Sequence, residues 1–190
     1  MTTLMNMEIK ELDEDDLAHK AASHADAFAE LYRAHVTKVY RYFMAHIGNV
    51  KDAEDLTSQT FTAALEGIRS FRGDGSFAAW IMGIASRKRL MFFRGNRFEV
   101  PLEAAEHYPS PSLPTDKAAM RRIRLESIAR ALRQLSPDRA EALVLVYFGG
   151  LTHIEASRVM KKSEASLKML VSRGLQDLRE RTSLGMEVEE

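Results

Sequence analysis

Prolines are concentrated in one short segment near the middle of the chain. Four of the five prolines lie within it, at Pro101, Pro109, Pro111 and Pro114, with serine and threonine among them. A proline inside a helix removes a backbone hydrogen bond and clashes with the preceding turn, so a segment of this composition cannot continue a helix. We therefore expect a semi-rigid linker over residues 98–120, with one folded module on each side of it.

The N-terminal module begins with a predicted helix. Apolar residues recur three and four positions apart from Ala27 to Ile47, which is the spacing of one helix face, and Gly48 ends the pattern. His35 lies on this apolar stripe and His46 beside it, and no second ligand stands at a matching spacing. We expect both histidines to pack in or beside the core rather than to bind a metal.

Two further helices are predicted before the linker. Asp52 is the expected N-cap of the first, and Ser76 caps the second after a glycine-containing turn at residues 71–76. The apolar side of the first of these helices is expected to consist of Leu56, Phe61, Leu65 and Ile68. Trp80 shares the spacing of Phe77 in the second helix, so core packing is favoured over base stacking for it.

The C-terminal module ends in two helices joined by a tight turn, within Leu151–Glu180. Thr152 and Glu155 form a capping box that starts a short helix, and Ser163 can cap a longer one. Before this hairpin, an apolar stripe is expected at Leu125, Ile128, Leu132 and Leu135, followed by a helix that starts at Ser136 and Pro137. A short helix, a turn and a longer helix with polar and basic outward residues are typical of a helix-turn-helix that binds the DNA major groove.

These patterns predict an all-α fold in which two small helical domains are joined by a flexible linker, the C-terminal one being a helix-turn-helix. No segment has the alternating pattern of a strand. The expected organisation is an acidic leader at 1–23, an N-terminal module at 24–97, a linker at 98–120, a C-terminal module at 121–182 and an acidic tail at 183–190.

Charge is segregated along the chain although the formal net charge is zero. Residues 31–98 hold eleven basic against five acidic side chains, residues 121–182 hold thirteen against seven, and residues 1–30 hold two against eight. Two basic blocks of this kind suit a polyanionic partner. The acidic leader could screen them, so its deletion is expected to raise DNA affinity at low salt; the alternative is a simple solubilising tail.

Composition also limits the compartment and the chemistry. The chain has no cysteine, which excludes disulfides and thiolate-bound zinc. It has neither an apolar run long enough to span a bilayer nor the pattern of a signal peptide, so we expect a soluble, cytoplasmic protein without membrane insertion. No phosphate-binding glycine loop, metal-spaced cluster or activated nucleophile is present, so we expect no enzyme activity, no metal and no cofactor.

Two segments resemble one known family. DAEDLTSQTF (52–61) together with FRGDGSFAAWIMGIA (71–85) resembles the second conserved region of bacterial sigma-70 initiation factors, and residues 132–180 resemble their fourth region. Their order, with a short linker and no third region, is similar to the extracytoplasmic function (ECF) group. The resemblance implies a subunit that binds the clamp and flap of core RNA polymerase, recognises the -35 and -10 elements of promoter DNA, and is held inactive by an anti-sigma factor.

The resemblance also implies which residues form each contact. The polymerase contact would consist of Asp55, Ser58 and Gln59. The -10 contact would consist of Phe71 with Met82, Gly83, Ser86 and Arg87, the last four on exposed helix positions. Arg87, Lys88 and Arg89 would bind the sugar-phosphate backbone of the DNA. The -35 contact would consist of Lys161, Lys162, Lys168, Met169, Ser172 and Arg173.

This chain departs from the family pattern at several of these positions. It has Ser58-Gln59 where relatives usually have Gln-Glu, Arg87 where they often have Asn, and Leu170 where many have a basic residue. These departures affect the polymerase contact and the promoter preference. Two alternatives stay open: a helix-turn-helix regulator that binds DNA alone, which leaves residues 52–61 unexplained, and a sigma-like decoy that binds an anti-sigma factor but no promoter.

Overall fold

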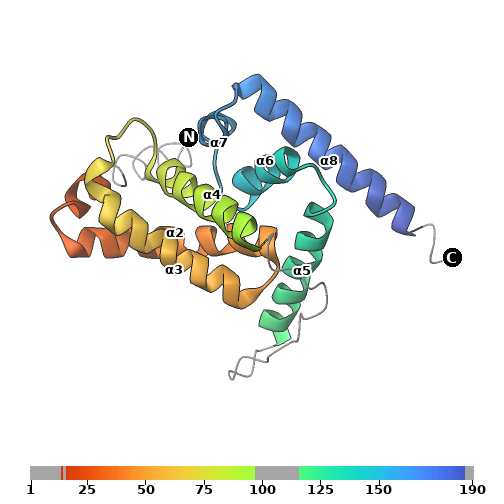
Figure 1. Cartoon of the computed structure of the whole chain (residues 1–190), viewed down its shortest axis with the longest axis horizontal. Helices are drawn as coiled ribbons and strands as arrows, with labels where there is room; N and C mark the ends of the chain where they lie inside the picture. Colours follow the sequence, from red (N-terminus) through yellow and green to blue (C-terminus); the bar gives the residue numbers. More distant parts are fainter. Residues whose placement is uncertain (1–13, 15, 97–115, 187–190) are drawn as a thin grey trace, which may run out of the picture.

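The computed structural model describes residues 14, 16–96 and 116–186, and all regular structure in that part of the chain is helical. The elements are α2 (Ala25–Ile47), α3 (Val50–Gly67), the short 3-10 helix η1 (Ile68–Ser70), α4 (Phe77–Asn96), α5 (Asp116–Leu132), α6 (Pro137–Tyr147), α7 (His153–Met160) and α8 (Glu164–Met186). The all-α prediction is thereby confirmed (Figure 1). Among the described residues, no helix is both long and apolar enough to cross a membrane.

The N-terminal module packs α2, α3 and α4 around an apolar core. Its fully buried side chains include Leu31 and Phe43 of α2 and Phe77 and Ile81 of α4. Helix α2 ends where Gly48 takes a left-handed conformation with φ of 73°, as the sequence predicts. His35 and His46 are both buried, which confirms their expected packing.

Two details of this module differ from the sequence prediction. Asn49, and not Asp52, caps α3, because the Asn49 side chain accepts a hydrogen bond from the Asp52 backbone N–H. Leu65 is 52% exposed, since α3 turns that position away from the core. In the acidic leader before this module, residues 16–21 are helical and bury Ala18 and Ala21, so this part of the leader packs against the protein.

The C-terminal module starts earlier than predicted. Helix α5 begins at Asp116, so residues 116–120 are helical and do not belong to the linker. Most of the predicted linker lies outside the described residues. Ile128 of α5 is 36% exposed, whereas Ala129 and Leu132 are buried in its place.

The helix-turn-helix forms as the sequence predicts. Thr152 and Glu155 make both hydrogen bonds of the capping box at the start of α7. The Ser163 hydroxyl accepts the Ser166 N–H at 3.2 Å and caps α8. Between them, Lys161 holds the turn with φ of 54°, a left-handed conformation that non-glycine residues rarely adopt.

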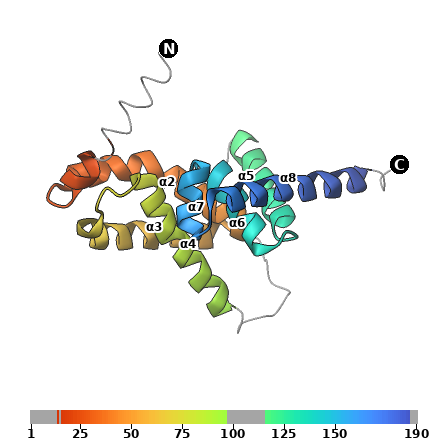
Figure 2. The ribbon, with the colours of Figure 1, turned by 90° about the horizontal axis from the view of Figure 1, so that it is seen from above.

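The two modules pack against each other. Helix α2 contacts α5 and α6 of the C-terminal module, and α4 contacts α7. Figure 2 shows α7 and α6 lying against the N-terminal helices, while the C-terminal halves of α4 and α8 extend away from the body of the molecule. The two helices expected to bind DNA, α4 and α8, therefore belong to modules that are packed together in this structure.

Candidate nucleic-acid interface

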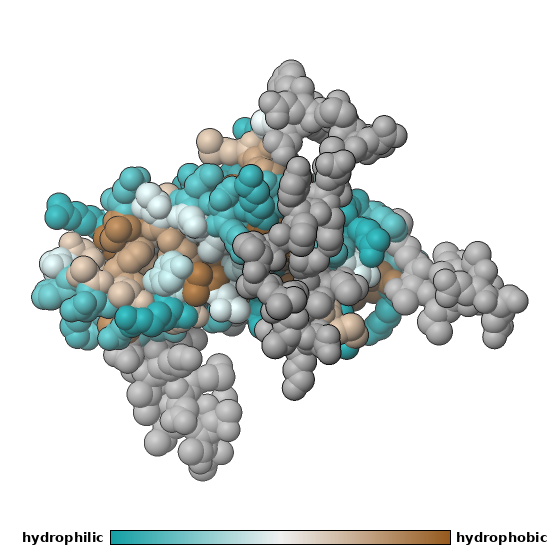
Figure 3. Space-filling model, turned by 90° about the horizontal axis from the view of Figure 1, so that it is seen from below, coloured by the Kyte–Doolittle hydropathy of each residue, from teal (hydrophilic) through white to brown (hydrophobic). Residues whose placement is uncertain are grey.

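The candidate polymerase residues form an exposed stripe on α3. Asp55, Ser58 and Gln59 are all exposed, and Ser58 and Gln59 lie one turn after Asp55 along the helix. Leu65 continues this helix and is also exposed, and Tyr32 of α2 is 43% exposed. Figure 3 shows an apolar area surrounded by hydrophilic side chains on the face seen from below. A surface that combines a carboxylate, an amide and exposed apolar side chains suits a protein partner.

The turn before α4 is held by aromatic packing. Phe71 is buried and makes edge contacts with Phe77 and Trp80, at ring-centroid distances of 6.0 Å and 5.6 Å. Trp80 is partly buried in this cluster, as expected for core packing. The Phe71 side chain therefore supports the turn from within, and the exposed part of the turn consists of Arg72, Gly73 and Asp74.

The candidate -10 residues on α4 divide into exposed and covered groups. Arg87 is exposed, and its Nε donates to the Gly83 carbonyl at 3.2 Å. Gly83 and Lys88 are partly buried. The expectation that Met82 is exposed is wrong, because its side chain is completely buried in the core. Its position follows the apolar stripe of Phe77, Ile81 and Ala85 more closely than the outward face.

Ser86 and Arg89 are drawn into a buried polar cluster around Glu141 of α6. The Ser86 hydroxyl donates to Glu141 Oε1 at 2.7 Å, and Arg89 Nε lies 3.0 Å from Glu141 Oε2. The Tyr42 hydroxyl donates to Glu141 Oε1 at 2.8 Å, and His46 Nε2 lies 2.9 Å from Glu141 Oε2. We call these five residues the Glu141 cluster; it joins α2 and α4 of one module to α6 of the other.

Burial and charge shift the pKa values within the Glu141 cluster. Burial alone would raise the pKa of Glu141, but the His46 contact, the positive charge of Arg89 and the Ser86 hydrogen bond outweigh it and lower the pKa to about 2. Burial lowers the pKa of His46, while burial and the Glu141 charge raise the pKa of Tyr42. At neutral pH the cluster therefore holds one carboxylate balanced by the Arg89 guanidinium.

Sequence reasoning missed Glu141, Tyr42 and His46 as partners of the α4 surface. Glu141 lies in an otherwise apolar stretch of α6, between Ala140 and Ala142. A carboxylate at a buried helix position needs charged or hydrogen-bonding partners, and this is the signal that could have identified it. The sequence does not name those partners, because they come from helices on the other side of the linker.

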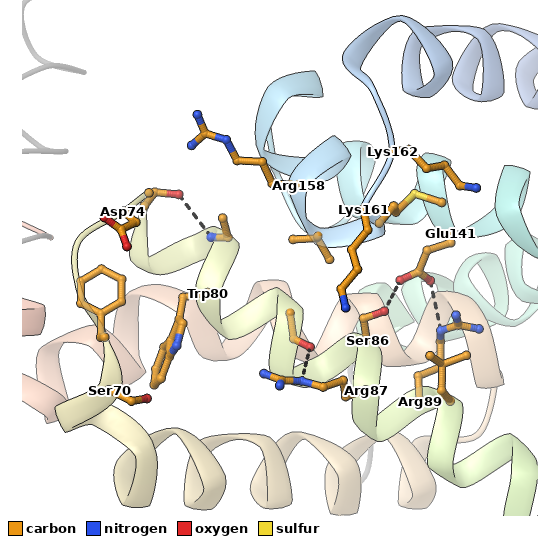
Figure 4. Close-up of a pocket in the computed structure, with 18 of the residues that line it drawn as sticks. Ser70, Asp74, Trp80, Ser86, Arg87, Arg89, Glu141, Arg158, Lys161 and Lys162 are labelled. Atoms are coloured by element: carbon orange, nitrogen blue, oxygen red, sulfur yellow. Dashed lines mark hydrogen bonds and ion pairs between the residues drawn. The ribbon is translucent and has the colours of Figure 1, made fainter.

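A second polar contact joins the two modules at the turn before α4. The Ser76 hydroxyl donates to Glu155 Oε1, while Glu155 also completes the capping box of α7. Between this contact and the Glu141 cluster lies a cleft of about 810 Å³, lined by α4, the start of α6 and the end of α7 (Figure 4). Its lining includes the basic residues Arg87, Arg158, Lys161 and Lys162 together with the acidic residues Asp74, Asp138 and Glu141.

The candidate -35 residues lie on the outward side of the helix-turn-helix. Lys168, Met169, Ser172 and Arg173 are all exposed on α8, while Leu167 and Val171 on the opposite side are buried. Lys161 is exposed in the turn. Lys162 is partly buried, and its Nζ lies 2.9 Å from Asp138 Oδ2, so it forms an ion pair within the C-terminal module.

The described residues contain no group of three or more histidine, cysteine or acidic side chains that could hold a metal ion. The charged side chains of α4 and α8 instead offer what a nucleic-acid surface needs, namely cations for phosphates and polar groups on an exposed helix face.

Comparisons with known proteins agree with this arrangement. Residues 31–99 match the family model described as Sigma-70 region 2, and residues 125–178 match the model described as Sigma-70, region 4. The chain is 34% identical over 161 residues to the ECF RNA polymerase sigma factor BldN of Streptomyces coelicolor, covering 83% of this chain and 61% of BldN. It is 28% identical over 173 residues to the ECF RNA polymerase sigma factor SigK of Mycobacterium tuberculosis, covering 88% of this chain and 92% of SigK.

Solved structures share the fold. CnrH, in a complex with the cytosolic domain of CnrY, superposes with a TM-score of 0.69 at 22% identity, over 90% of this chain and 98% of that one. The sigma factor RpoE of Bartonella quintana, in a complex with the anti-sigma factor NepR, gives a TM-score of 0.62 at 21% identity, over 80% and 94% of the two chains. With both conserved regions matched in order and with curated ECF relatives along most of its length, this chain belongs to the ECF group of the sigma-70 family.

Proposed function

We propose that this chain is a promoter-specificity subunit of bacterial RNA polymerase. Helix α3 binds the clamp of core polymerase through Asp55, Ser58 and Gln59, α4 holds the -10 element, and α8 enters the major groove of the -35 element. The C-terminal module also contacts the flap. The observation that carries the proposal is the pair of matched regions, each presenting an exposed polar or basic helix face. The subunit has no catalytic step of its own and acts in the cytoplasm.

The basic residues of the two modules support distinct roles in DNA binding. Arg87 and Lys88 lie in the middle of α4, further along the chain than the turn at residues 71–76, and cations there can follow the phosphates of a single strand. Lys168 and Arg173 are exposed on α8, the helix that follows the turn of the helix-turn-helix. Guanine is the favoured base for an arginine that reaches a base edge, so Arg173 is the proposed base contact.

An anti-sigma factor is the proposed regulator. The structure of RpoE with NepR is described as a complex with an anti-sigma factor, and its fold is shared by this chain. A protein that binds both modules would cover α4 and α8 together. The cleft between the modules and the exposed apolar side chains of α4, Leu90 and Met91, provide the surface for it.

Transcription with purified core polymerase tests the proposal directly. The chain and core polymerase, on a promoter library with sequenced start sites, are expected to initiate at a common pair of spaced elements. A stand-alone regulator would give no transcripts without another sigma factor, and a decoy would bind an anti-sigma factor but start none. Asp55→Lys should reduce initiation by weakening polymerase binding, while Glu66→Lys, an exposed position on the same helix, should have a smaller effect.

A further inference from the structure

A short helix of the acidic leader lies against the turn that precedes α4. Residues 16–21 form this leader helix, in which Ala18 and Ala21 are buried and Leu17 packs against the core. Figure 1 shows the leader helix, in red, beside the loop that leads into α4. The turn at residues 71–76 therefore borders the leader helix as well as α4.

His19 is the residue of the leader helix that contacts this turn. Its ring centroid lies 5.8 Å from that of Phe71, at an interplanar angle of 47°. A Cβ at position 73 would lie 3.2 Å from His19 Nε2, and Gly73 has a φ of 73°, so a glycine leaves the room in which the imidazole lies. His19 is exposed whereas Phe71 is buried, and the imidazole thus forms part of the surface at the turn.

Packing fixes the leader helix in this place. His35 of α2 is fully buried, and its ring centroid lies 5.3 Å from that of Phe77, the residue that begins α4. Before the leader helix, Glu14 Oε2 lies 3.3 Å from His35 Nε2. Phe77 also contacts Phe71, so ring contacts connect the core of the module to His19. A ring supported in this way loses little conformational entropy when a ligand binds to it.

The turn residues themselves, all within the described part of the chain, present no exposed ring to a base. The exposed residues of the turn are Arg72, Gly73 and Asp74. Phe71, which the family resemblance implies as a -10 contact, is buried. Capture of a base that has left the duplex uses an aromatic surface beside cations that hold the phosphates. His19 provides such a surface, and Arg72 provides a cation next to it in the turn.

We propose that His19 is a base-binding residue of the -10 site, whose imidazole, held over Gly73 by the leader helix, stacks on a base released from the duplex. The proposal rests on the proposed function in one respect, namely that the turn and α4 hold the -10 strand. It gives the leader a part in promoter binding besides the effect of its charge. Because a ring can stack on any of the four bases, His19 contributes affinity for the unpaired strand more than base preference.

The test compares variants of the full chain bound to core polymerase. His19→Ala removes the ring, and His19→Gln removes the ring but keeps a polar side chain of similar length. His19→Phe loses the ring nitrogens and keeps an aromatic face. His24→Ala is the matched control, because this exposed histidine of the leader lies against Ser23, with 2.9 Å between His24 Nδ1 and Ser23 Oγ.

Binding is measured by fluorescence anisotropy on a mapped promoter with a preformed bubble over the -10 element. In a series of such promoters, one unpaired nucleotide at a time is replaced by an abasic sugar. His19→Ala should weaken binding to the intact strand by about tenfold, the scale of one lost stacking contact. The same substitution should have little effect at one abasic position, since the stacking partner is already missing there. His19→Phe and His24→Ala should bind every strand as the unsubstituted chain does.

An equal loss for His19→Ala on every abasic strand would overturn the proposal and leave His19 only a role in supporting the turn. Unchanged binding in His19→Ala, or binding by His19→Phe as weak as that of His19→Ala, would also overturn it. If thermal unfolding shows that His19→Ala has lost its fold, His19→Gln decides. Transcription by the unsubstituted chain with core polymerase is scored first, so a failure of the proposed function is distinguished from a failure of the His19 contact.

Discussion

Tyr42 and Glu141 are 99 positions apart in the chain, and the Tyr42 hydroxyl donates to Glu141 Oε1 at 2.8 Å inside the protein. The bond joins α2 to α6 and so links the two modules across the linker. Both groups are buried, and each would be costly to bury without the other. This pair is a polar contact that joins the modules beside their shared apolar core, and the effect of its removal can be measured.

Low pH should reduce the free energy of unfolding, because Glu141 is held ionised in the folded protein. Its pKa of about 2 in the folded state lies below the ordinary value of 4.5, so the unfolded chain takes up the proton first. The contribution to stability is present above pH 4.5 and is lost as the pH falls toward 2, by about 3 kcal/mol in total. His46, whose pKa burial lowers, acts in the same direction near its ordinary value of 6.5.

Chemical denaturation between pH 7 and pH 3 measures this effect. Glu141→Gln should have a lower free energy of unfolding at pH 7 and a flatter dependence on pH than the unsubstituted chain. Glu66→Gln, at an exposed position, is the control and should keep the original slope. Parallel pH profiles for all three proteins would contradict the assignment of the shifted pKa to Glu141.

Gly174 allows α8 to approach α6 closely. A Cβ at this position would lie 2.9 Å from Leu143 Cδ1 and 3.2 Å from Leu143 Cγ. Gly174→Ala should therefore destabilise the protein by about 1–3 kcal/mol through overpacking, despite the better helix propensity of alanine. Gly95→Ala in α4 is the matched control, since nothing lies within 4 Å of its Cβ, and it should be neutral or stabilising. Equal unfolding midpoints for the two variants would argue against a tight contact.

The capping box of α7 should contribute measurably to the helix-turn-helix. Thr152→Ala removes the hydroxyl that accepts the Glu155 N–H, and a loss of about 0.5–2 kcal/mol is expected. Thr152→Ser keeps the hydroxyl and should retain most of the stability. Urea denaturation compares the two variants, and a Thr152→Ser variant as unstable as Thr152→Ala would point to the methyl group rather than the cap.

Arg173 should contribute to -35 recognition. Arg173→Ala is expected to weaken binding to a mapped promoter by about 1–3 kcal/mol for one lost base contact. Gln176→Ala, one turn further along the exposed side of α8, is the comparison. Titration of duplex DNA by fluorescence anisotropy, with polymerase bound, provides the affinities. Unchanged promoter binding in Arg173→Ala would remove this residue from the contact.

Local rules predicted most of the helices and their ends. The periodic apolar residues, the turn at residues 71–76, the Ser76 and Ser163 caps and the capping box at Thr152 are all present. The misassigned cap of α3 has a local reason as well. Asn49 directly follows the glycine that ends α2, and its side chain begins the next helix three residues before Asp52.

Prediction was weaker where a side chain's surroundings come from distant segments. Leu65 has the spacing of a core residue but is exposed, and Met82, expected on the outward face of α4 from the family resemblance, is buried beside Ile81. Helical periodicity defines a face only to within about one residue position, and the neighbouring helices decide which edge of that face is covered.

The sequence by itself determined the all-α class, the division into two modules and the family, because these depend on local periodicity, proline content and contiguous motifs. Only the tertiary structure decided that Glu141 and Glu155 bind the α4 surface, and that Ser86 and Arg89 are engaged there before any DNA arrives. The physical reason is that a buried carboxylate requires partners, while their identity depends on which helices the folded chain brings within hydrogen-bonding distance.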